Sequence, residues 1–417
     1  MNLYIINYLT LSKSGDPMLP QSFKKAKPII DQIEKHGYKA YFVGGCVRDY
    51  LLKHDIGDID IATSASPEDI IRLFSKVIPV GIEHGTVIVR HDHESYEVTT
   101  FRVDGTYSDH RHPDSVKFID QIDYDLQRRD FTINAIAMDK NGQILDLFDG
   151  QKDISQKIIR TVGEAADRFN EDPLRIIRAL RFSARLGFII HIDTLQAMKK
   201  VKYRINNLAI ERVQKEFSKF FSGYYINQGL VYLEETGIYT ELPIIKDNPH
   251  LIHMLPKPML SLYSFGEVIA LLHYLEDSVS IPVWTKKWKC SNKIKEEALQ
   301  LNTSILDYTR HGLTPWLVYK LSNKYFEGFI RLLHCLNSTT VLTLNELTET
   351  EEKLPIQSKN DLDFNGHDLY RMFPEVKKGP WMQDTLSKVE KAVVTGKLNN
   401  YNNEIKEWIR WNPPEIN

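Results

Sequence analysis

The stretch that decides the fold is residues 44–63, GGCVRDYLLKHDIGDIDIAT. Its second half is typical of a short strand that carries the two aspartates Asp58 and Asp60. Side chains two apart on a strand project to the same face, so both carboxylates would lie together, with Ile59 and Ile61 buried behind them. Two carboxylates this close repel each other unless a cation lies between them, and Mg²⁺ favours oxygen ligands completed by substrate phosphates. The pattern therefore predicts a magnesium site.

The two aspartates alone are weak evidence, because a surface turn is the commoner setting for such a tripeptide. The Gly-Gly turn upstream favours a different interpretation. Glycine lets backbone N–H groups approach a phosphate closely, here at Gly45, and Arg48 supplies paired donors to it. Together these residues predict a nucleoside triphosphate site. Glu97, on a neighbouring predicted strand, is either a further metal ligand or an ordinary strand charge, and the sequence leaves both alternatives open.

Around this stretch, the first third of the chain mixes helical and strand periods, which predicts an α/β or α+β catalytic head over residues 23–150. Ser66 directly precedes one of the predicted helices and is a suitable N-cap. The expected helices are 23–36, 47–52 and 67–74, and the expected strands are 41–43, 59–62, 87–89 and 96–101.

After residue 150 the strand signals nearly vanish, and the remaining chain reads as helical, broken by Pro and Gly. Helical patterns cover 172–186 and 210–221. We therefore expect an α+β fold in which a mixed sheet with helices is followed by an elongated all-helical part. The expected division is an N-terminal extension 1–22, the head 23–150, a helical neck 151–225, a helical body 226–320 and a helical tail 321–417.

Composition narrows the class of protein. The 417 residues carry a formal charge of −2, so a nucleic-acid binder would have to concentrate its Lys and Arg locally, for instance at residues 199–204. No apolar run is long enough to cross a membrane. Residues 1–17 do not resemble a signal peptide, and we expect a poorly ordered extension or an upstream start. Three widely spaced cysteines without a CxxC pair argue against disulfides and a thiolate zinc site and favour the cytoplasm.

Five motifs identify a family. GGCVRD followed by GDIDIAT resembles the first motif of the class II tRNA nucleotidyltransferase and poly(A) polymerase family, within the polymerase β-like superfamily. The other motifs follow in family order, and the set covers roughly residues 41–221. They are RRDFTINA at 128–135, DLFDG at 146–150, EDPLR at 171–175 with Arg178 and Arg181, and ERV at 211–213. The C-terminal stretch 379–408 also resembles the tail of bacterial members.

The resemblance implies a polymerase β-like nucleotidyltransferase head that adds C, C and A to the 3′ end of tRNA without a template, using CTP and ATP. It implies Mg²⁺ as cofactor, tRNA lacking part or all of its CCA end as partner, and a tail that binds this tRNA. No membrane and no stable protein partner are expected. Asp58 and Asp60 match the catalytic metal ligands. The positions that match nucleotide contacts are Gly45, Arg48, Arg129, Asp172, Arg175, Arg178 and Arg181.

Elementary hydrogen bonding explains how two of these residues select C and A. Asp172 and Arg175 are three apart in a predicted helix and would share one face. A carboxylate accepts hydrogen bonds and a guanidinium donates them, which satisfies cytosine and adenine. Guanine and uracil would present a carbonyl to the carboxylate, and a site built on that hydrogen bond rejects them by about 10⁴-fold. Arg178, Arg181 and Arg185 follow at helical spacing, and we favour contacts with triphosphate or tRNA over a solvated basic face.

Several activities within the family have to be separated. Residues 79–87 resemble the CCA-adding branch and lack the Arg-rich signature of bacterial poly(A) polymerases. Residues 102–113 resemble the flexible loop that CC-adding relatives lack, which argues against a CC-only enzyme. An A-adding enzyme would keep this loop. The alternative is therefore an A-adding tRNA nucleotidyltransferase or a poly(A) polymerase of the same family.

Overall fold

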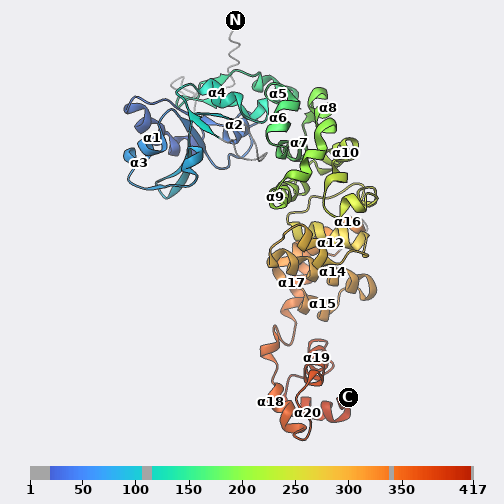
Figure 1. Cartoon of the computed structure of the whole chain (residues 1–417). Coiled ribbons are helices and arrows are strands. Elements are labelled where there is room, and N and C mark those ends of the chain that lie inside the picture. Colours follow the sequence, from blue (N-terminus) through green and yellow to red (C-terminus); the bar gives the residue numbers. More distant parts are fainter. Residues whose placement is uncertain (1–18, 106–114, 338–341, 415–417) are drawn as a thin grey trace. The chain divides into compact units, whose positions relative to one another are not determined.

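The computed structural model describes residues 19–105, 115–337 and 342–414, and the chain divides into two compact units (Figure 1). The first unit is Met1–Phe220 with Gln228–Leu242, and the second is Phe221–Asn227 with Pro243–Asn417. The first unit joins the predicted head to most of the predicted neck, so their side chains form one site. The five-part division given above stays a prediction.

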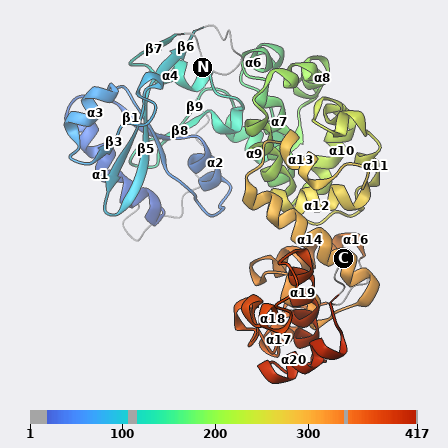
Figure 2. The same cartoon turned by 60° about the horizontal axis from the view of Figure 1, so that its bottom comes forward.

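A mixed seven-stranded sheet, in the order β3-β4-β5-β2-β1-β8-β9, forms the centre of the head (Figure 2). β1 pairs antiparallel with β2 and β8, whereas β2 and β5 run parallel. A separate antiparallel pair, β6 and β7, flanks residues 106–114. The strands are β1 Ala40–Val43, β2 Asp60–Thr63, β3 Val77–Ile78, β4 Thr86–His91, β5 Glu94–Thr100, β6 Arg102–Asp104, β7 Val116–Phe118, β8 Ile136–Met138 and β9 Ile144–Asp146.

Helices pack around this sheet, which confirms the predicted α+β class. Those of the head are α1 Gln21–Lys35, α2 Gly45–Leu51, α3 Pro67–Leu73, α4 Ile122–Gln127 and α5 Gly150–Gln156. α1 buries an apolar stripe at helical spacing, and it lies beside α3 (Figure 2). Ser66 caps α3 in a reciprocal capping box with Asp69, so the predicted N-cap is confirmed.

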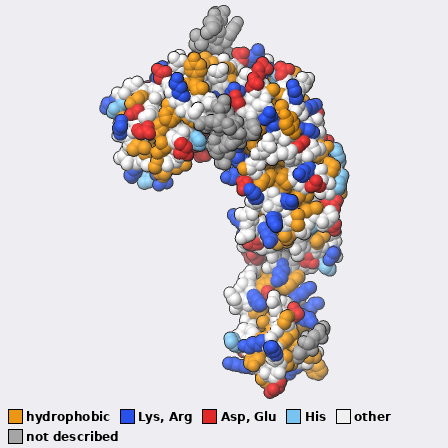
Figure 3. Space-filling model, in the orientation of Figure 1, with side chains coloured by type: hydrophobic (Ala, Val, Ile, Leu, Met, Phe, Trp, Pro, Cys, Tyr) orange, Lys and Arg blue, Asp and Glu red, His pale blue; other side chains and the backbone are white. Residues whose placement is uncertain are grey.

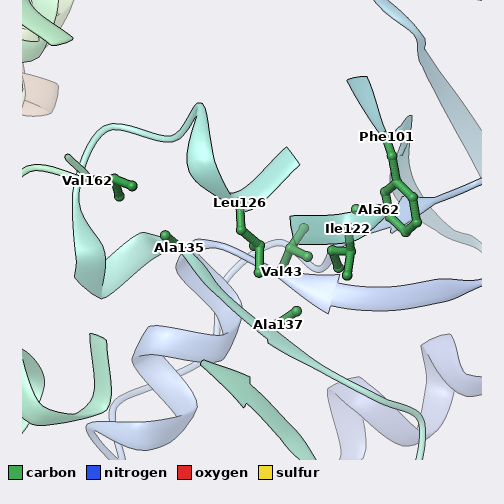
Figure 4. Close-up of a cluster of buried hydrophobic side chains, with 8 residues drawn as sticks. All are labelled: Val43, Ala62, Phe101, Ile122, Leu126, Ala135, Ala137 and Val162. Atoms are coloured by element: carbon green, nitrogen blue, oxygen red, sulfur yellow. The ribbon is translucent and has the colours of Figure 1, made fainter. Parts of the chain in front are cut away.

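The core that holds the site lies between the sheet and α4. Ile122 and Leu126, one turn apart on α4, contact a buried cluster that includes Val43 of β1, Ala62 of β2 and Ala137 of β8 (Figure 4). Side chains four apart lie on one face of a helix, so both anchor the same face. This packing fixes α4 and the arginines that follow it.

The neck is helical with one exception. Its helices are α6 Ala165–Glu171, α7 Leu174–Leu186, α8 Ile192–Val201 and α9 Ile210–Phe221, and α10 Ile226–Thr236 follows the predicted neck. Two short strands, β10 Ile158–Ile159 and β11 Ile189–Ile190, pair in parallel, so the prediction of an all-helical neck was wrong. Pairs of isoleucines are too short to show a strand period, which is why the sequence did not reveal them.

The second unit is helical throughout its described residues. Its helices are α11 Leu251–Met254, α12 Phe265–Leu275, α13 Ile281–Lys287, α14 Asn292–His311, α15 Pro315–Lys320, α16 Phe326–Leu336, α17 Leu344–Glu352, α18 Gly366–Met372, α19 Pro380–Val394 and α20 Asn402–Trp411. Among the helices that the structure describes, none has the length and apolar composition to cross a membrane.

Candidate active site

The site begins with Asp60, the first residue of β2, which stands opposite Glu97 of β5 in the parallel register. Ile59 and Ile61 are buried, as predicted. Asp58 precedes the strand in an exposed bend, so strand periodicity does not set the direction of its side chain. This corrects the prediction that both aspartates share one face of a strand.

Three carboxylates act on one another at this point. The pKa of Asp60 is raised to about 6, mainly by burial and then by the charges of Glu97 and Asp58, while the charge of Arg129 lowers it. In the described ranges no group of three or more His, Cys, Asp or Glu could hold a metal by itself. Mg²⁺ fits this donor set, because it often uses one or two carboxylates and takes its remaining oxygens from water and phosphate.

A glycine turn brings an arginine up to these carboxylates. Gly44, between β1 and α2, has φ +74°, a value that side-chain-bearing residues rarely adopt. A Cβ there would lie 3.0 Å from Nη1 of Arg129 and 3.9 Å from Oδ2 of Asp60. The adjacent Gly45 would place a Cβ 3.6 Å from Nη2 of Arg48, an ordinary contact. Gly44 therefore provides both the turn and the space that Arg129 occupies.

Arg48 is buried and is held by two partners. Its Nε and Nη2 donate to Oδ1 of Asp49 over 2.9 and 2.8 Å, and Nη1 donates to Oδ1 of Asn134 over 2.6 Å. A buried charge is tolerated when it is paired in this way. The guanidinium of Arg48 is consequently fixed at the N-terminal end of α2.

Asp130 extends this network from the head to α7. Its Oδ1 accepts from Nδ2 of Asn134 at 3.1 Å, and its Oδ2 accepts from Nε and Nη2 of Arg178 at 2.7 and 2.6 Å. Burial by itself would raise the pKa of Asp130, but Arg178, the Asn134 hydrogen bond and Arg175 together hold this pKa well below its usual range. Asp130 is therefore a permanent anion at neutral pH.

A second ion pair continues along α7. Nε of Arg181 lies 3.1 Å from Oε2 of Glu216 on α9. Burial, with Arg178 beside it, lowers the pKa of Arg181 to about 10, so the side chain remains charged at neutral pH. The alternative of a solvated basic face is wrong for Arg178 and Arg181, whereas Arg185 is exposed.

One aromatic ring gathers three of the predicted nucleotide-binding arginines. The guanidinium carbons of Arg181, Arg48 and Arg178 lie 4.3, 5.2 and 5.5 Å from the centroid of the buried Phe182 ring. Cation–π attraction contributes about 0.5–2 kcal/mol for each such contact. Residues from α2 and α7, far apart in the chain, thereby converge.

The predicted base-reading pair is arranged differently from our expectation. α7 begins at Leu174, so Asp172 lies before the helix and does not share a helical face with Arg175. The Asp172 carboxylate accepts from the Leu174 N–H at 3.0 Å and from Nη2 of Arg212 at 2.8 Å. Nη1 of Arg175 donates to Glu171 at 3.0 Å. Pro173 explains the error, because proline suits the start of a helix.

Sequence reasoning missed the carboxylates and the amide that hold these arginines in place. They are Asp125, Asp130, Asn134 and Glu216, all of them buried. Asp130 and Asn134 lie in the quoted RRDFTINA motif, where polar residues between apolar ones were a usable signal. For Asp125 and Glu216 the sequence offers only helical spacing to nearby residues.

Two further predictions concern the basic cluster at residues 199–204 and the segments 102–113 and 1–17. In the basic cluster at residues 199–204, Lys199 pairs with Glu235 at 2.9 Å and Lys202 donates to the Gly237 carbonyl at 3.0 Å, so these lysines have structural partners. Residues 106–114, most of the predicted flexible loop, and residues 1–17, the predicted extension, lie outside the described residues.

Comparison with known families covers most of the chain. A model described as the poly A polymerase head domain matches residues 40–160, and one described as a probable RNA and SrmB-binding site of polymerase A matches 187–248. A model of a putative tRNA nucleotidyltransferase domain 2 matches 264–409. The matches follow the same order as the motifs.

Whole-chain relatives agree with these matches. The chain is 48% identical over 401 residues to a CCA-adding enzyme of Oceanobacillus iheyensis, covering 96% of this chain and all of the relative. It is 39% identical to the CCA-adding enzyme of Bacillus mycoides, covering 94% and 98%. A crystal structure of the Bacillus stearothermophilus CCA-adding enzyme in complex with CTP superposes with a TM-score of 0.84 at 36% identity, covering 94% and 98%.

Proposed function

This chain belongs to the bacterial CCA-adding enzymes of the tRNA nucleotidyltransferase and poly(A) polymerase family, and on that basis we propose that it adds C, C and A to tRNA ends from CTP and ATP. The observation that carries the proposal is the convergence at Asp60. A half-buried carboxylate, a second carboxylate in register and an arginine meet at a glycine turn. We further propose that the enzyme works in the cytoplasm.

The chain's own residues divide the work of nucleotidyl transfer. Asp58 and Asp60 would hold Mg²⁺, which when bound activates the tRNA 3′-hydroxyl and stabilises the leaving pyrophosphate. Arg129 lies beside Asp60, and its buried Nε finds no acceptor among the described residues, so it retains hydrogen-bonding capacity. Gly45, with its backbone N–H at the start of α2, and Arg48 would orient the triphosphate.

Selection of C and A falls to Asp172 and Arg175. In this structure Asp172 is paired with Arg212, and Arg175 is paired with Glu171. When a base binds, Asp172 would offer its remaining lone pairs and Arg175 its remaining N–H donors, or each would exchange its partner for the base. A buried acceptor facing the carbonyl of guanine or uracil would stay unsatisfied, which costs enough free energy to reject those bases. Arg178 and Arg181 would add positive charge to the lining of the site.

The tail supplies a surface suited to the tRNA backbone. Arg371 of α18 and Lys406 and Arg410 of α20 line one pocket beside Asp368, and among the described residues none of the three cations forms an ion pair. On the face shown in Figure 3, basic side chains gather over these C-terminal helices. Unpaired cations favour phosphate contacts, so we propose that the tail binds tRNA.

Substitution of the two aspartates tests the proposed metal site. Asp60→Ala and Asp58→Ala should each abolish CTP and ATP incorporation, while tRNA binding in a gel-shift assay persists. Asp55→Ala is the matched control, because Asp55 is an exposed aspartate in the same loop. The control should retain activity. Substantial incorporation by both active-site variants would refute the assignment.

A further inference from the structure

A buried carboxylate in the head binds two arginines at once. Asp125 lies on α4 with 1% of its surface exposed. Its Oδ1 accepts from Nε and Nη2 of Arg128 at 3.0 and 2.7 Å, and its Oδ2 accepts from Nη2 of Arg129 at 3.2 Å. Burial would raise the pKa of Asp125, but the charges of Arg128 and Arg129 lower it, so the carboxylate stays ionised.

Arg128 connects this carboxylate to the base-reading side of the site. Its main-chain carbonyl accepts a hydrogen bond from Nη2 of Arg175 at 2.9 Å. Its guanidinium lies between Asp125 and Asp104 of β6, which is 3.6 Å away. The main-chain N–H of Arg128 donates to the Tyr124 carbonyl at 3.3 Å, and its guanidinium is paired with Asp125, so both ends of the residue whose carbonyl receives Arg175 are tied to α4.

Arg129 connects the same carboxylate to the metal side. Its Nη1 borders the space beside Gly44, and its charge lowers the pKa of Asp60. Apart from its bond to Asp125, the Arg129 guanidinium donates to the Asn134 carbonyl over a long 3.5 Å. The bond that Arg129 donates to Asp125 is therefore the shorter of the two that orient this guanidinium.

We infer that Asp125 is a positioning residue that sets both Arg129, beside the metal carboxylates, and, through Arg128, the base-reading Arg175. The inference rests on the proposed function of those residues. α4 is anchored in the core by Ile122 and Leu126, so the carboxylate is a rigid support (Figure 4). One residue thus joins the two halves of the site, which contribute catalysis and selection.

Asparagine removes this support with little change of volume. An amide oxygen can accept from one arginine, but the amide NH₂ then faces the donors of the other. One guanidinium must therefore turn away. Misplacement of a reacting group by about 1 Å costs on the order of 100-fold in rate. A purely structural role would only reduce the amount of folded enzyme, leaving KM and base selection unchanged.

The test compares Asp125→Asn with Asp153→Asn, measuring kcat, KM and misincorporation of GTP and UTP on tRNA lacking CCA. Asp153, on α5, is the matched control. It is 2% exposed, and its Oδ2 lies 3.1 Å from Nε of Arg160. For Asp125→Asn we expect kcat/KM for CTP and ATP to fall about 10- to 100-fold, with higher KM and weaker discrimination. For Asp153→Asn only apparent kcat should fall, in proportion to unfolding.

Three outcomes are distinguished. If Asp125→Asn behaves like Asp153→Asn, with unchanged KM and discrimination, the positioning role is overturned. If Asp125→Asn does not fold, Asp125→Glu replaces it, because glutamate keeps both ion pairs but displaces the arginines by one methylene. Wild-type KM and wild-type discrimination in Asp125→Glu would also overturn the positioning role. A wild type that adds neither C nor A would instead contradict the proposed function itself.

Discussion

At the scale of single residues, buried carboxylates organise the arginines of the site. Asp125 binds Arg128 and Arg129, and Asp130 binds Arg178 and, through Asn134, is linked to Arg48. Each carboxylate would be costly to bury alone, and each arginine likewise, so removal of one partner leaves an unpaired charge. The stability of the site is therefore tied to the ionisation of these carboxylates.

The lowered pKa of Asp130 determines how the stability of the protein should change with pH. Because this pKa is lowered in the folded protein, the stabilisation is fully present above the unfolded pKa, about 4, and is lost progressively as the pH falls from there through the lowered folded-state pKa. We expect Asp130→Asn to unfold about 1–3 kcal/mol more easily than the wild type at pH 7, since Arg178 is partly exposed. Denaturant unfolding at a series of pH values measures this difference.

The difference between Asp130→Asn and the wild type should narrow as the pH falls from 5 toward 3. An Asp55→Asn variant, changed at an exposed position, serves as the control and should follow the wild type at every pH. A difference of the same size at pH 3 and pH 7 would show that the ionised carboxylate is not the source of the stabilisation.

At the scale of elements, the turn from β1 into α2 leaves the space that Arg129 occupies beside Asp60. Gly44→Ala forces a positive φ on alanine and places a methyl group 3.0 Å from Arg129. Stability should fall by about 1–2 kcal/mol, and CTP and ATP incorporation should fall at least tenfold. Unfolding curves and initial rates measure both effects.

Gly37→Ala separates the two causes. Gly37 also has a positive φ, +87°, but a Cβ there meets no atom within 4 Å. That variant should lose stability yet keep its activity once folded. Equal losses of activity in Gly37→Ala and Gly44→Ala would mean that backbone strain, and not the displaced Arg129, is responsible.

Elements with a strong local period were predictable from sequence. The pattern at 210–221 matches α9, and the capping box at Ser66 marks the start of α3. β8 was not predicted, because its three buried residues show no alternation, although it pairs with β1 at the centre of the sheet. The helical pattern over 172–186 includes Asp172, whereas α7 begins at Leu174, directly after Pro173.

At the scale of the whole molecule, the order of the motifs along the chain was predictable from sequence, but the way their side chains converge in space was not. The motifs identify the family in sequence, and the family models match in the same order. The pairing of Arg178 with Asp130, 48 positions apart, and of Arg181 with Glu216 depends on how α7 packs against the head and α9. Local spacing carries no information on such long-range contacts.

The central claim is that one chain adds C, C and A without a nucleic-acid template. The most direct measurement incubates the enzyme with tRNA lacking its CCA end, supplies CTP and ATP singly and together, and sequences the products. We expect CC with CTP alone, CCA with both nucleotides, and no further extension. Addition of A alone, long A tracts or incorporation of G and U would contradict the account.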